Sequence, residues 1–136
     1  MKKILLSFLL LANISVYAQT TYDVVVGPGL TYSPDVLTIN EGDAVTFTSE
    51  GGSHDVNFDI NTLTGQSFGN PSEVTSLPTQ GAGLMGTITF DVAGTYNYDC
   101  SVYGHASAGM VGQIIVTATA SNTIVDIVVN LSLIHI

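Results

Sequence analysis

A short segment near the end of the chain contains three side chains that can bind a metal through sulfur or nitrogen. They are Cys100, which is the only cysteine, His105 and Met110. A further histidine, His54, lies upstream in a glycine-rich segment. Thiolate and thioether donors favour Cu(I), whereas imidazole also binds Cu(II). These side chain types together favour a copper site that tolerates both oxidation states and can pass single electrons.

Each of these residues also has a simpler explanation. A lone cysteine is often a small buried core residue, His54 could be solvated in its loop, and Met110 could simply begin a strand. Cys100 and His105 could form a thiol nucleophile and its base, and zinc could occupy the same donors, although a thioether is a poor zinc ligand. The joint occurrence of all four donors at this spacing favours a copper site over these alternatives.

Short strands must position these residues, because helical periodicity is nearly absent. Runs of β-branched and aromatic residues alternate with turn residues, which predicts an all-β fold: a Greek-key antiparallel β-sandwich of about seven to eight strands. Between the strands, residues 61–83 are rich in Gly, Ser, Thr, Asn and Pro. We expect this segment to be a long loop with at most one helical turn. The expected strands cover residues 22–27, 36–39, 44–48, 56–58, 86–90, 95–100 and 110–117.

The order of the four donors and their flanking residues resembles the cupredoxin family, the group of plastocyanin, azurin and rusticyanin. The resemblance covers roughly residues 22–118 and is strongest from Tyr98 to Val116. Tyr-x-Cys, and Gly-Met-Val-Gly before an apolar strand, are similar to plastocyanin. The four-residue gap between Cys100 and His105 is more similar to azurin and rusticyanin.

The resemblance implies a role for each donor. His54 and His105 would bind one type 1 copper ion through ring nitrogens, Cys100 as a thiolate and Met110 as a long axial contact. His54 would come from a loop between strands, and the others from the loop between the last two strands. The protein would then carry electrons between redox partners and would not be an enzyme. Copper oxidases and nitrite reductases, by comparison, need further histidines.

One departure from the family concerns the residue after the first histidine. Plastocyanin and azurin usually have Asn there, whereas this chain has Asp55. In the family that side chain ties the two ligand loops together, so we expect Asp55 to accept the backbone N–H of Ser101. A carboxylate near the thiolate would also favour Cu(II) and lower the potential.

The N-terminus has the pattern of a secretory signal peptide. It begins with Lys2 and Lys3, continues with the apolar run 4–11 and offers a small residue for cleavage at Ala18. The run is too short to span a membrane comfortably. We therefore expect a periplasmic or secreted protein, with no membrane span in the mature chain.

Cleavage would leave a strongly acidic protein. Lys2 and Lys3 are the only Lys or Arg residues, so losing them changes the formal net charge from −9 to −11. This charge repels nucleic acid and attracts basic surfaces. We expect redox protein partners with basic docking surfaces and no nucleic acid. Acidity that only keeps a secreted protein soluble is the alternative.

The sequence divides into four expected parts. A signal peptide covers 1–18, a copper-binding domain covers 19–119, and 120–130 would be a linker or the start of a lost C-terminal region. Residues 131–136 are what a library-preparation transposase end (CTG TCT CTT ATA CAC ATC) encodes, so we expect them to be translated adaptor. Two further functions stay open: a copper-carrying or storage module, and an adhesion or interaction domain of a larger exported protein.

Overall fold

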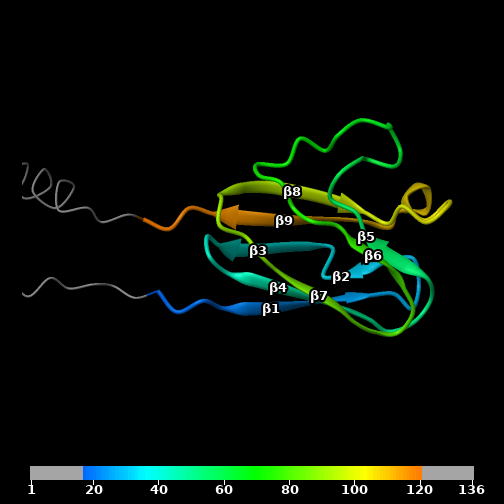
Figure 1. Ribbon diagram of the computed structural model, residues 1–136, viewed down its shortest axis with the longest axis horizontal. Helices are drawn as coiled ribbons and strands as arrows, with labels where there is room; N and C mark the ends of the chain where they lie inside the picture. The colour runs from blue at the N-terminus through cyan, green and yellow to red at the C-terminus, as the bar shows by residue number, and fades with distance from the viewer. Residues whose placement is uncertain (1–16, 121–136) are drawn as a thin grey trace, which may run out of the picture.

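The computed structural model describes residues 17–120, which form nine strands and one short 3-10 helix (Figure 1). The expected signal peptide up to residue 16 and the segments after residue 120 lie outside the described residues. Within residues 17–120, no helix is long and apolar enough to cross a membrane. The elements are β1 (Thr21–Val26), β2 (Tyr32–Ser33), β3 (Val36–Asn40), β4 (Ala44–Ser49), β5 (His54–Val56), β6 (Leu77–Gln80), β7 (Gly83–Thr89), β8 (Gly94–Asp99), η1 (Ala106–Ala108) and β9 (Val111–Thr117).

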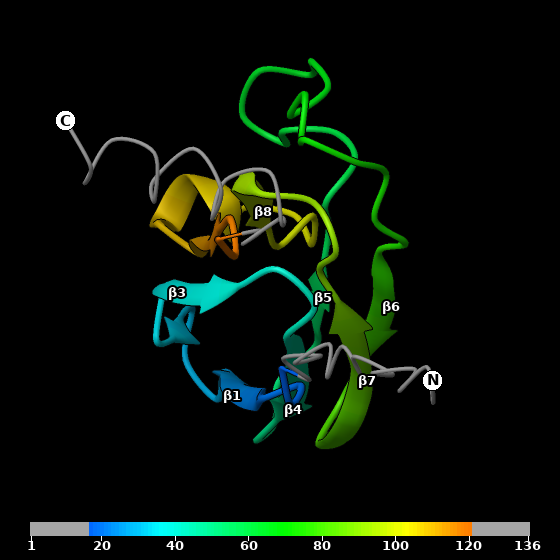
Figure 2. The same cartoon turned by 90° about the vertical axis from the view of Figure 1, so that its left-hand side faces the viewer.

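The strands form two layers that pack face to face (Figure 2). One sheet has the order β2-β1-β4-β7 and the other the order β3-β9-β8, while β5 pairs with β6. The predicted all-β sandwich is therefore confirmed. Two pairs depart from the antiparallel arrangement, because β1 runs parallel to β4 and β3 runs parallel to β9. In both cases the chain visits the other sheet between the paired strands and returns in the same direction.

The alternation of buried and exposed residues along the strands explains how the core forms beneath the segment 100–110. In β9 every second residue is buried, including Ile114 and Val116, as expected for a strand with one face on the core. The ring of Tyr98 in β8 packs against Tyr32, Phe47 and Phe58, with centroid separations of 4.8, 5.7 and 5.0 Å. This aromatic cluster supports the end of β8, two residues before Cys100.

The segment 61–83 is only partly the loop that the sequence predicts. β6 lies within it, and β7 already begins at Gly83. Pro78 interrupts the sequence pattern of β6, which is why this strand was not expected. A single turn forms near its start, where the Gly65 N–H donates to the Asn61 carbonyl (2.8 Å), and no helix follows it within the segment, which agrees with the expectation of at most one helical turn. Figures 1 and 2 show that its first part stands out beside β8.

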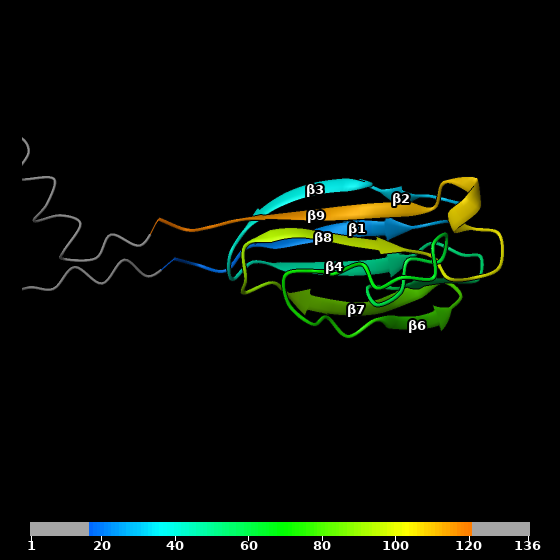
Figure 3. The ribbon, with the colours of Figure 1, turned by 90° about the horizontal axis from the view of Figure 1, so that it is seen from above.

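The sandwich is elongated along its strands, as Figures 1 and 3 show. The two ends of the described chain emerge together at one end of the sandwich. The connection from β8 to β9, which contains η1, lies at the opposite end. The segment 100–110 is thus presented at one tip of the molecule.

Candidate metal centre

Two nitrogen atoms and one sulfur atom converge at this tip. His54 Nδ1 lies 3.2 Å from His105 Nδ1 and 3.9 Å from Cys100 Sγ, and Cys100 Sγ lies 3.3 Å from His105 Nδ1. The point in the plane of these three atoms that is equally far from each of them lies about 2.0 Å from each. This distance is close to the length of a metal–imidazole bond and slightly shorter than a metal–thiolate bond. The three side chains could therefore hold one metal ion in a trigonal arrangement.

Two parts of the chain supply the predicted ligands. His54 is the first residue of β5, rather than a loop residue as expected. Cys100 directly follows β8, His105 precedes η1 and Met110 precedes β9. The backbone N–H of Cys100 donates to the carbonyl of Met110 (3.1 Å), and that of Met110 donates to the carbonyl of His105 (3.0 Å). These bonds close the loop and hold the backbones of Cys100, His105 and Met110 close together.

His54 is held in a slot between two glycines. A Cβ atom on Gly27 would lie 3.0 Å from the His54 ring and 2.6 Å from the carbonyl oxygen of Gly51. A Cβ atom on Gly52 would overlap His54 Nε2. This nitrogen is buried and has no hydrogen-bond partner among the described residues. Close packing therefore orients the ring and turns Nδ1 toward the other donors.

Burial governs protonation of the site when no metal is bound. It lowers the pKa of His54, and the neighbouring His105 ring lowers that pKa further. Burial also raises the pKa of the Cys100 thiol. At neutral pH, His54 is therefore a neutral imidazole that can bind a metal directly. Cys100 is a thiol whose proton must leave when a metal binds.

Asp55 joins the two ligand segments, as the sequence predicts. One carboxylate oxygen accepts a 2.7 Å hydrogen bond from the backbone N–H of Ser101, and the other accepts the Ser101 hydroxyl. Asp55 is buried. Its carbonyl oxygen accepts a 2.6 Å hydrogen bond from the Tyr32 hydroxyl. The residue after His54 is thereby fixed to the residue after Cys100.

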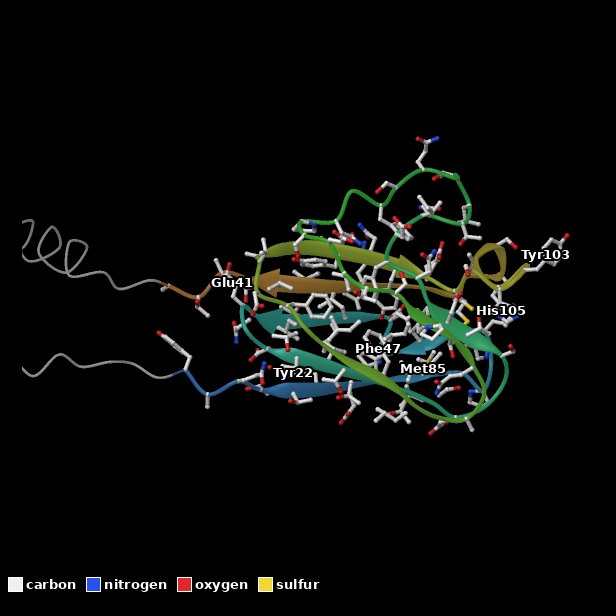
Figure 4. The ribbon with its side chains drawn as sticks, viewed as in Figure 1. Tyr22, Glu41, Phe47, Met85, Tyr103 and His105 are labelled. Carbon is white, nitrogen blue, oxygen red and sulfur yellow. The ribbon has the colours of Figure 1, made fainter. Side chains whose placement is uncertain are left out.

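Among the four predicted ligands, only His105 is partly exposed. His54 is 2% exposed, and Cys100 and Met110 are fully buried. Figure 4 shows His105 near the tip of the molecule, with Tyr103 pointing away from the body beyond it. The partly exposed ring of His105 therefore offers the most direct route from solvent to the buried donors.

Sequence reasoning missed Asp99, the residue directly before Cys100. Asp99 is 1% exposed, and its carboxylate accepts hydrogen bonds from Asn57 and Thr62. An acidic residue that ends an aromatic strand beside a ligand was a signal that could have found it. The glycines that pack against His54 were also missed, because the sequence does not show which glycines contact the ring.

Comparison with known proteins identifies the family. The model for copper binding proteins of the plastocyanin/azurin family matches residues 18–117. The chain is 30% identical over 112 residues to the copper-resistant cuproprotein CopI of Rubrivivax gelatinosus, covering 73% of this chain and 67% of that protein. It is 37% identical over 89 residues to the chloroplastic plastocyanin of Tetradesmus obliquus, covering 64% of this chain and 59% of that protein.

Solved structures show the same fold. A reduced amicyanin variant has a TM-score of 0.54 at 24% identity, covering 74% of this chain and 86% of that one. An oxidised variant of amicyanin gives the same TM-score of 0.54. The chain therefore belongs to the cupredoxin family of copper binding proteins. The family and the His–Cys–His donors at the tip together support one copper ion.

Proposed function

We propose that this protein is a type 1 copper electron carrier with His54, Cys100 and His105 as strong ligands and Met110 as the axial ligand. The observation that carries this proposal is the convergence of two imidazole nitrogens and one sulfur around a common point. Bound copper supplies a one-electron couple between Cu(II) and Cu(I). The closed loop and the packed His54 ring keep the donors in place, so little rearrangement accompanies electron transfer.

The described residues favour a carrier over an enzyme. They contain two histidines, His54 and His105, and both contribute to the same site. Centres with additional copper ions would need further histidines. Cys100 is fully buried, whereas a thiol nucleophile needs access to its substrate. We therefore propose that the protein passes electrons between redox proteins and turns over no substrate.

A Cu(II) titration of the metal-free chain from Gln19 tests this function. We expect an intense blue thiolate-to-copper absorption band that saturates at one equivalent of copper. The Cys100→Ser variant, which lacks the thiolate, should fold and show no such band. Colourless or nonstoichiometric binding by the unmodified chain would refute the proposal.

We propose that electrons enter and leave through the exposed edge of His105. In the same loop, Ala108, Gly109 and Val111 are exposed and form a small uncharged surface. Transient redox complexes use small interfaces of this kind. No Lys or Arg occurs among residues 17–120, so basic surfaces on the partner would favour docking.

The variant Ala108→Asp tests this surface by electron self-exchange between two copies of the protein. A new carboxylate must lose water and face another copy, so we expect the self-exchange rate measured by NMR line broadening to fall about tenfold, equivalent to ~1.4 kcal/mol. The visible spectrum should not change. Thr21→Asp adds the same charge at the opposite end of the molecule and should have little effect. Equal rates in the two variants would place the electron port elsewhere.

Asp55 should lower the midpoint potential of the site. Its carboxylate lies between the two ligand segments and favours the more positive Cu(II) form. Asn in its place can still accept the Ser101 N–H and can donate to the Ser101 hydroxyl. We therefore expect Asp55→Asn to raise the midpoint potential measured by voltammetry with little change in structure. An unchanged or lower value would contradict the prediction.

A copper-holding module is the second candidate function. It is favoured by the similarity to a protein named as a copper-resistant cuproprotein. Such a module would bind copper through the same four residues without rapid electron transfer. A very slow self-exchange rate in the unmodified protein would favour this function over the electron carrier.

We also propose that the protein works in the periplasm or outside the cell. The support is the signal-peptide pattern of residues 1–18. Fractionation of cells that produce the full chain, with mass determination of the exported form, tests the location. A cytoplasmic protein that retains Met1–Ala18 would contradict it.

A further inference from the structure

Asp99, the residue directly before Cys100, is a second buried carboxylate in addition to Asp55. Asp99 Oδ1 accepts hydrogen bonds from Asn57 Nδ2 (2.7 Å) and from the Thr62 hydroxyl (2.9 Å). Asp99 Oδ2 accepts a 2.7 Å hydrogen bond from the backbone N–H of Thr62. Both oxygens accept and neither donates, as in a carboxylate anion. Residues 17–120 contain no Lys or Arg, so polar groups alone stabilise this buried charge.

The same contacts fix the segment after His54 to the strand that carries Cys100. Asn57 and Asp99 exchange two backbone hydrogen bonds, of 2.9 and 3.0 Å. The Asp99 side chain then extends this attachment to Thr62, at the start of the long loop. Asp55 and Ser101 join the two segments on one side of Cys100, and Asp99 joins them on the other.

We propose that Asp99 is a positioning residue that also biases the copper site toward Cu(II). The inference rests on the proposed function, because it concerns the redox potential of the same site. Cu(II) carries one more positive charge than Cu(I), so a fixed anion on the residue directly before the Cys100 ligand stabilises the oxidised form more strongly. Hydrogen bonds from Thr62 withdraw part of that negative charge and weaken the bias.

Two variants with opposite expected effects test the proposal. Asp99→Asn removes the charge and should raise the midpoint potential more than Asp91→Asn does, because Asp91 is exposed and follows β7 at the opposite end from the ligand loop. Thr62→Val keeps the charge but removes one donor to Asp99, so it should lower the potential. A purely structural loosening of the loop would not move the two potentials in opposite directions.

A second measurement on the metal-free protein tests the positioning role. The Thr62 amide donates to Asp99 Oδ2, so its hydrogen exchange should be faster in Asp99→Ala, which has no side-chain acceptor, and unchanged in Asp91→Ala. Unchanged Thr62 exchange in Asp99→Ala would refute the positioning role.

The possible outcomes separate the two proposals. An unmodified protein without a blue band would overturn the electron-carrier function, together with the effect on potential. A normal blue band with equal potentials in Asp99→Asn and Asp91→Asn would overturn only the role of Asp99. If Asp99→Asn does not fold, Thr62→Val decides: a lower potential supports the proposal, and an unchanged or higher one refutes it.

Discussion

Replacing Gly52 with alanine should weaken copper binding by about 10- to 100-fold, the usual effect of disturbing the groups that orient a metal ligand. The new Cβ atom would overlap His54 Nε2, and the ring has no room to retreat because Gly27 packs on it as well. The imidazole must turn, which moves Nδ1 away from Cys100 and His105. Competition with a chelator of known affinity measures the loss.

Gly51→Ala is the matched control for this prediction. Gly51 and Gly52 both have positive φ values, of 138° and 85°, so alanine strains the backbone at either position. A Cβ atom on Gly51, however, meets no heavy atom within 4 Å. We expect Gly51→Ala to lose far less copper affinity than Gly52→Ala. Similar losses in both variants would mean that backbone strain, rather than contact with His54, controls the site.

Replacing Gly112 with alanine should destabilise the whole domain. Its Cβ atom would overlap the Tyr98 ring, which cannot shift because Tyr32, Phe47 and Phe58 pack around it. Overpacking of this kind costs about 1–3 kcal/mol, and sometimes more. Denaturant unfolding of the metal-free protein should therefore show a reduced free energy of unfolding by at least that amount.

Gly29→Ala is the corresponding control, because a Cβ atom there meets nothing within 4 Å and its φ is not positive. Its free energy of unfolding should match that of the unmodified protein. Equal stability of Gly112→Ala and Gly29→Ala would show that the Tyr98 ring can move, and the aromatic cluster would then not be the rigid support described above.

The sequence indicated most of the candidate donors because their signal is local. Cys100, His105 and Met110 lie within eleven residues, and thiol, imidazole and thioether groups have few other joint uses. The hydrogen bond from Ser101 to Asp55 was also predicted, through the resemblance to a family in which this position joins the ligand segments. The ligand roles themselves remain predictions until copper is added.

The contacts that support the donors were not predicted because they join distant parts of the chain. Thr62 and Asn57 lie 37 and 42 residues from Asp99, and no local pattern pairs them. The parallel pairing of β1 with β4 depends on which sheet the intervening strands enter. The alternation of apolar and polar residues shows which face of a strand is buried, but it does not show which other strand pairs with it.

The arrangement of the chain ends determines how the molecule can be attached to other structures. Both ends of the described chain leave the sandwich at the end opposite the segment 100–110 (Figures 1 and 3). One strand length, about 20 Å, therefore separates the chain ends from this segment. A fused domain, an affinity tag or an electrode linker at either end would therefore leave His105 facing outward. Immobilisation through a terminus should orient all copies alike and keep the end that carries His105 accessible to a soluble protein.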